Sequence, residues 1–164
     1  MNLIGELDGR ASSRCDTIKA ALDAGGIPAD VVDNIIARMW HKFFGWATIA
    51  TISSLTRAPT GLTAQSAIGP AFVSAVLDEC TRVATAEGYP PPPEILTILR
   101  GALAQTATDS RVSILVDMAE GRPTECEQTI GDLVARATRR GVAAPILTAA
   151  LCNLQAYEIN RKRA

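Results

Sequence analysis

Apolar residues recur every three or four positions through most of this chain, which is the pattern of helices that bury one face. The first such segment contains Cys15, Ile18 and Leu22, with Ser12 or Ser13 available to cap it. The second begins at Asp30 as N-cap and runs into residues 43–55, FFGWATIATISSL, which carry no charge. A helix that is apolar on every side is typical of a buried central position. We therefore expect a helical protein built around residues 43–55.

Glycine and proline residues divide the rest of the chain into further helices. We expect these helices at about 65–87, 94–107, 111–120 and from Pro145 onward. Residues 90–93, all proline, should form a stiff extended connector, and residues 108–110 a loop. Thr124 and Glu127 have the spacing of a capping box, which would open one more helix.

The first residues predict a single short strand. Asn2 to Leu7 partly alternate between apolar and polar positions, and Asp8-Gly9 is a turn signal. No second strand is predicted for it to join, and no βαβ unit. We expect an all-α, multi-helix bundle in residues 10–164, preceded by a strand remnant in residues 1–9.

The composition is that of one packed globular domain. The chain has 164 residues, of which 48% are hydrophobic and 20% charged. A net charge of −1 provides no basic field for nucleic acid or an anionic membrane. The longest apolar run is too short to span a membrane, and Glu6, Asp8 and Arg10 interrupt any leader-like segment. We expect a soluble cytoplasmic protein.

Metal binding is not predicted. The four cysteines, Cys15, Cys80, Cys126 and Cys152, form no C-x-x-C pair, and His41 is the single histidine. A structural zinc site needs closely spaced ligands of these types. We expect each cysteine to be a small buried hydrophobe in a reducing compartment.

Two charged residues have both a structural and a functional interpretation. Glu125 stands in the first turn of the helix that Thr124 would cap, where the helix dipole favours a carboxylate even without a further role. Lys42 opens the uncharged segment, so it is either a surface lysine or an ammonium at the edge of a cleft. Periodicity alone does not decide between these interpretations.

Several motifs, taken in order, resemble ketopantoate reductase (2-dehydropantoate 2-reductase). They are residues 4–9 (IGELDG), residues 40–42 (WHK), Ser113 with Asp117, and residues 121–125 (GRPTE) with Gly131. The resemblance covers nearly the whole chain but only the C-terminal half of the family. It implies an all-α fold similar to the C-terminal domain of 6-phosphogluconate dehydrogenase, and a homodimer.

The resemblance also implies roles for three residues. The family reduces the ketone of 2-ketopantoate with NADPH, and a positioned acid must protonate the oxygen that becomes negative. By resemblance, Lys42 is that acid, Glu125 contacts the substrate and the surroundings of the lysine, and Ser113 binds the substrate carboxylate. The 2-keto acid is therefore the expected small-molecule ligand.

Two departures from the family pattern change the expected activity. Trp46 and Ala50 stand where the family has asparagines, and no G-x-G-x-x-G motif occurs. We expect no cofactor to be bound by this chain alone and no activity without a separate nucleotide-binding domain. The alternative is a non-catalytic helical module that binds a small acid or forms a homodimer.

Overall fold

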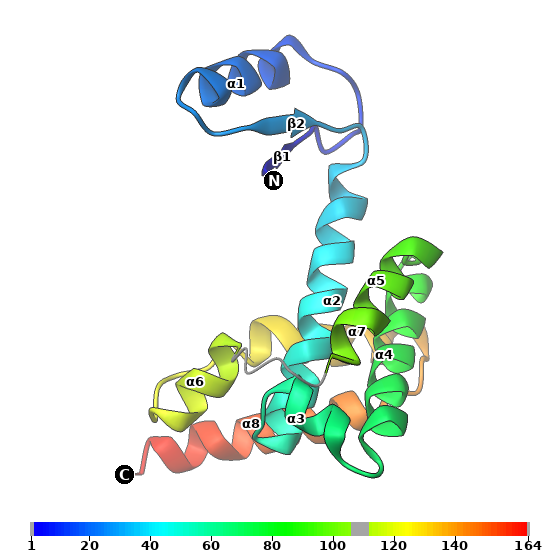
Figure 1. Ribbon diagram of the computed structural model, residues 1–164, viewed down its shortest axis with the longest axis vertical. Helices are drawn as coiled ribbons and strands as arrows, with labels where there is room; N and C mark the ends of the chain where they lie inside the picture. Colours follow the sequence, from blue (N-terminus) through cyan, green and yellow to red (C-terminus); the bar gives the residue numbers. More distant parts are fainter. Residues whose placement is uncertain (1, 106–111, 164) are drawn as a thin grey trace. The chain divides into compact units, whose positions relative to one another are not determined.

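The computed structural model describes residues 2–105 and 112–163, and it confirms the all-α class with short strands near the N-terminus. The chain divides into two compact units, Met1–Lys42 and Phe43–Ala164. Helix α2 (Ile35–Thr56) begins in the first unit and continues into the second. Figure 1 shows the elements of each unit. The loop predicted at residues 108–110 lies outside the described residues.

The first unit contains β1 (Asn2–Ile4), α1 (Ser13–Ala24) and β2 (Ala29–Val31). The strands pair in parallel, with Asn2 opposite Ala29 and Ile4 opposite Val31. Helix α1 connects them and packs beside β2 (Figure 1). The predicted cap is present, because the Ser12 hydroxyl accepts a 3.2 Å bond from the Cys15 N–H.

The prediction of a lone strand and no βαβ unit was wrong. Ala29–Val31 forms the second strand, and the predicted cap Asp30 lies inside it, while α2 begins only at Ile35. A three-residue strand is too short to show the alternation by which strands are recognised in sequence. The compact unit that holds both strands is Met1–Lys42.

The second unit is helical throughout its described residues. After α2 it contains α3 (Thr60–Gln65), α4 (Gly69–Ala86), α5 (Pro93–Leu103), α6 (Ser113–Ala119), the π-helical turn η1 (Glu127–Gly131), α7 (Asp132–Arg140) and α8 (Pro145–Arg161). The proline connector precedes α5 as predicted, with Pro92 in extended conformation. Pro145 is at the start of α8, and Gly141 ends α7 with a positive φ of 65°.

The predicted continuous helix at 65–87 is divided. Helix α3 ends at Gln65 and α4 begins at Gly69, followed by Pro70, a residue favoured at the first helical turn. The chain turns so tightly here that a Cβ on Gly69 would lie 1.8 Å from the carbonyl oxygen of Thr63. Only glycine fits this position without a shift of the backbone.

The core of the second unit surrounds the uncharged half of α2, as predicted. Phe44, Ala47, Ala50 and Ile52 are fully buried there. Leucines and isoleucines from α4 to α8 pack in the same core: Leu77, Leu103, Ile114, Ile130, Leu133, Leu147 and Leu154. Burial of each such side chain contributes about 1.5–3 kcal/mol. This core fixes the helices that carry the candidate site.

Candidate functional site

A pocket of about 180 Å³ lies on the second unit and contains two of the three predicted site residues. Its lining combines an apolar wall with hydroxyl and carboxyl groups: Trp46, Ser113, Ile114, Asp117, Pro123 and Glu125. Trp46 comes from α2, the next three from α6, and the last two from the segment between α6 and η1. Ser113 and Glu125 therefore belong to one pocket.

Helix α6 presents Ser113 and Asp117 to the pocket because they are four residues apart and share a helix face. Leu115 and Met118 are buried on the side that faces the core. Asp117 was part of the motif in the sequence but was not predicted as a site residue; its spacing from Ser113 was the available signal. Its carboxylate accepts from Nε of Arg122 at 2.9 Å and from Nη2 at 2.8 Å.

The segment after α6 turns sharply at Gly121, whose φ is 72°. The N–H of Arg122 donates to the carbonyl of Asp117 at 2.8 Å, which closes a Schellman-type turn. The left-handed conformation explains the glycine at this position. The turn brings Pro123 and Glu125 back to the pocket formed by α6.

Helix α8 holds this segment at two places. The hydroxyl of Tyr157 lies 3.0 Å from the carbonyl oxygen of Asp117 and 2.7 Å from that of Arg122. The Glu158 carboxylate accepts from the N–H of Thr124 at 2.7 Å and from its hydroxyl at 2.9 Å. Neither contact was predicted, because residues more than thirty positions apart give no local signal.

The predicted capping box was wrong. Thr124 bonds to Glu158 on α8, and Glu127 instead accepts from Nε2 of Gln155 at 2.8 Å. The turn that follows is π-helical, with the Gly131 N–H donating to the Cys126 carbonyl at 2.8 Å. A capping box requires an α-helical first turn, which the π-helical turn does not provide. Contacts to α8 take its place.

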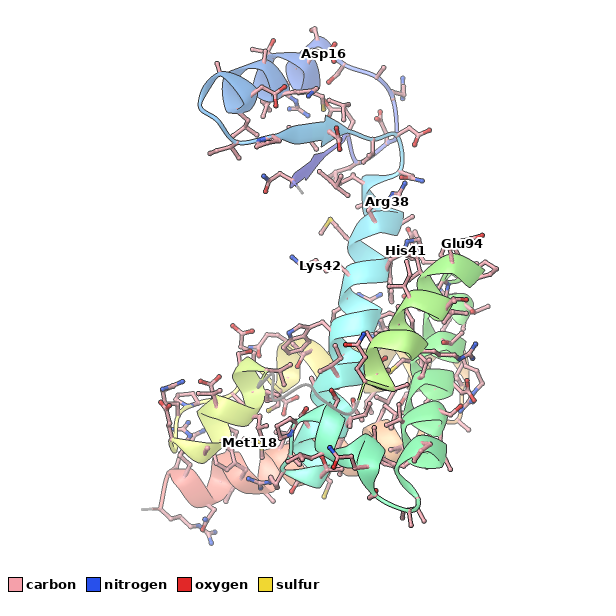
Figure 2. The ribbon with its side chains drawn as sticks, in the orientation of Figure 1. Asp16, Arg38, His41, Lys42, Glu94 and Met118 are labelled. Atoms are coloured by element: carbon pink, nitrogen blue, oxygen red, sulfur yellow. The ribbon has the colours of Figure 1, made fainter. Side chains whose placement is uncertain are left out.

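Glu125 itself is exposed at the rim of the pocket, and no side-chain partner is described for it within residues 2–105 and 112–163. Ser113 is also exposed. Lys42 belongs to the first compact unit, where it projects from α2 into solvent (Figure 2). Its proposed chemical role remains a prediction.

The cysteines do not add chemistry to this pocket. Cys15, Cys80 and Cys126 are buried as predicted, whereas Cys152 is exposed, which corrects the expectation for that residue. Burial raises the pKa of the Cys80 thiol to about 12, so it stays protonated at neutral pH. Within the part of the chain that the structure describes, no three residues are grouped as metal ligands.

The turn after β1 does not fit a dinucleotide phosphate. A Cβ on Gly5 would lie 2.5 Å from the carbonyl oxygen of Val32, so the missing side chain serves packing within the chain. The Ser12 hydroxyl donates to the Glu6 carboxylate at 2.5 Å and Nε of Arg14 donates to it at 3.0 Å, so these donors are engaged within the chain. A phosphate needs donors at that position.

None of the described helices is long and apolar enough to cross a bilayer.

The helical fold agrees with the all-α C-terminal domain that the resemblance in the sequence implies. The family described as ketopantoate reductase PanE/ApbA C terminal matches residues 34–158, and the chain belongs to this family. This finding confirms the resemblance seen in the sequence.

Individual relatives agree with this assignment. The uncharacterized oxidoreductase YkpB of Bacillus subtilis is 27% identical over 161 residues, covering 97% of this chain and 52% of that protein. The crystal structure of 2-dehydropantoate 2-reductase from Methylococcus capsulatus has a TM-score of 0.82 and 26% identity, covering 99% of this chain and 56% of that one. A dimeric ketopantoate reductase from Staphylococcus aureus shares the fold, with a TM-score of 0.82 and 20% identity, over 93% of this chain and 53% of that one. The chain thus spans about half the length of the curated relatives it matches.

Proposed function

We propose that this chain is the substrate-binding domain of a ketopantoate reductase-like oxidoreductase, and that its pocket binds a small 2-keto acid. The observation that carries the proposal is the joint presence of Ser113 and Glu125 in one pocket. Family membership supports it independently. Both residues were singled out from motifs that are separate in the sequence.

Each polar group has a proposed task in the reduction of a ketone. The Ser113 hydroxyl donates a hydrogen bond to the substrate carboxylate. When the ketone is reduced, negative charge develops on its oxygen, and the Lys42 ammonium gives a proton to that oxygen. Glu125 accepts a hydrogen bond from a substrate hydroxyl. NADPH supplies the hydride in the family-based proposal, and we assign no residue of this chain to its binding.

A non-catalytic module is the second candidate function, and Trp46 favours it. An indole that lines the pocket can donate one hydrogen bond but accepts none, so the amide contacts expected from asparagine are lost. In this alternative the chain binds a small acid or a second copy of itself without chemistry. The similarity in fold to the dimeric ketopantoate reductase of Staphylococcus aureus supports a homodimer for this chain as well.

Calorimetric titration of the purified chain with ketopantoate and with pantoate tests the proposed site. We expect saturable binding that weakens about tenfold in Glu125→Ala and in Lys42→Ala, because each loses a charge-assisted hydrogen bond. Glu94→Ala and Lys162→Ala are matched controls, since both residues are exposed, and they should bind like the parent.

The same preparation tests whether the chain depends on another nucleotide-binding domain for the reduction. Binding without oxidation of added NADPH is the result expected for a substrate domain that depends on another nucleotide-binding domain. Turnover by the chain alone would contradict that dependence. Absence of binding in the parent, with an intact helical circular dichroism spectrum, would reject the substrate-binding function and leave the homodimer alternative.

A further inference from the structure

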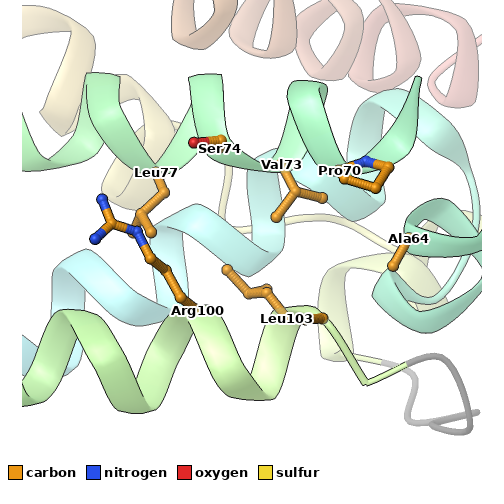
Figure 3. Close-up of a pocket in the computed structure, with 8 residues that line it drawn as sticks. Ala64, Pro70, Val73, Ser74, Leu77, Arg100 and Leu103 are labelled. Atoms are coloured by element: carbon orange, nitrogen blue, oxygen red, sulfur yellow. The ribbon is translucent and has the colours of Figure 1, made fainter.

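A second cavity lies in the unit Phe43–Ala164, and it shares no lining residue with the pocket of Ser113 and Glu125. It has a volume of about 250 Å³ and lies between α3, α4 and α5 (Figure 3). Most of its wall is apolar, and one charged residue contributes to it: Ala64, Pro70, Val73, Ser74, Leu77, Arg100, Leu103 and Ala104. Nothing in the reductase chemistry described above uses this cavity.

The one charged group of the lining lies at one end of the cavity. Figure 3 shows Arg100 reaching from α5 toward Leu77 at one end, with Pro70 and Ala64 at the other. Pro70 and Leu77 are two turns apart on α4, a length of about 10 Å. Val73 and Leu103 face each other between these ends (Figure 3). The shape therefore suits an elongated molecule with one polar end.

The guanidinium of Arg100 is available for such a polar end. Its described partner is Asp78, with 3.6 Å between Nη2 and Oδ1, longer than a direct hydrogen bond. The side chains are 56% and 51% exposed, and exposed ion pairs of this kind contribute little. A guanidinium carries five N–H donors and binds carboxylates with two of them at once.

We propose that this cavity binds a linear apolar carboxylate. The carboxylate accepts hydrogen bonds from Arg100, and the hydrocarbon chain extends between Val73 and Leu103 toward Ala64. Burial of the chain provides most of the affinity, and Arg100 selects the charged end over an uncharged one. The site is separate from the proposed 2-keto acid site, so either can be wrong without affecting the other.

Octanoate is the probe for this proposal, because its extended length matches the two helical turns. In a titration followed by ¹⁵N–¹H NMR, we expect saturable shifts of amides in α4 and α5, around Val73, Leu77 and Leu103. Arg100→Gln should weaken octanoate binding about tenfold. Ser74→Phe, which fills the cavity from an exposed position, should abolish it.

Two controls make the experiment decisive. Arg139→Gln removes an exposed positive charge from α7 and should leave octanoate binding unchanged. 1-Octanol should bind the parent more weakly than octanoate does. Arg100→Gln should leave the affinity for 1-octanol unchanged. Equal octanoate affinity in parent and Arg100→Gln, or no saturable shifts in α4 and α5, would overturn the proposal. Shifts of the same amides with protein concentration alone would also overturn it, since a second copy would then cover the cavity.

Discussion

Glu158 is the residue whose contacts bear most directly on the proposed site without lining it. One carboxylate oxygen accepts both bonds from Thr124, and the other accepts from the Arg161 guanidinium at 2.7 Å. Partial burial favours the neutral acid, but the bonds from Arg161 and Thr124 outweigh it and lower the pKa of Glu158. The carboxylate is therefore charged at neutral pH, and it fixes the backbone immediately before Glu125.

Glu158→Gln tests this positioning role. The amide oxygen can still accept both bonds from Thr124, but without the charge, and the ion pair with Arg161 is lost, so we expect a loss of about 1–2 kcal/mol in unfolding free energy. Ketopantoate should bind the variant more weakly but still give a measurable heat in calorimetric titration. The NMR amide shifts of Thr124 and Glu125 should change. Glu94→Gln is the control. Unchanged Thr124 and Glu125 shifts would show that the charge of Glu158 does not position the segment.

Among the helices, α4 and α7 are joined by a charged contact at their ends. Glu87 follows α4, its side chain is only 8% exposed, and it accepts from Nε of Arg140 at 2.7 Å and from the Arg136 guanidinium. The bond from Arg140 lowers the pKa of Glu87, burial raises it, and the bond from Arg136 lowers it further. Within α4, the buried carboxylate of Glu79 accepts from the N–H groups of Ile146 and Leu147 and so caps the start of α8.

Glu87→Gln should destabilise the chain by about 1–3 kcal/mol at neutral pH, the range for hydrogen bonds to charged groups. The pKa of Glu87 is lowered in the folded state, so its contribution is complete above the unfolded value of about 4.5. It is lost as the pH falls through the folded value. Urea unfolding of parent and variant should therefore differ at pH 7 and converge as the pH falls from 4.5 to below the folded pKa of Glu87. A pH-independent difference would exclude the charge as the cause.

For the molecule as a whole, the first unit has the features that favour association. Each of its strands pairs only with the other among the residues described, so both have an open edge. A two-stranded sheet is marginal in isolation. Large apolar side chains are also exposed on this unit, including Leu7 at 79% and Met39 at 58%. These surfaces favour contact with another copy.

We therefore predict a homodimer at micromolar concentration, measured by light scattering coupled to size-exclusion chromatography. Leu7→Lys combined with Ile27→Lys places charge on the exposed apolar surface of the first unit and should shift the chain toward monomer. Leu62→Lys with Ile68→Lys changes exposed residues of the second unit and serves as the control. A monomeric parent would contradict the prediction.

Local patterns determined the helical class, the buried segment 43–55, the glycine at the end of α7 and the proline that opens α8. These features depend on periodicity and on backbone preferences of single residues, which any stretch of sequence carries with it. The motifs containing Ser113 and Glu125 were also visible. Their chemical roles remain predictions.

Tertiary structure alone decided the rest. The pairing of Asn2–Ile4 with Ala29–Val31, the bonds from Thr124 to Glu158 and the cavity beside Arg100 join residues far apart in the chain. Thr124 illustrates the physical reason: a local capping partner three residues away competed with a carboxylate on α8, and the packing of α8 decided which bond formed. Local sequence establishes which partners are compatible, and the packed core selects among them.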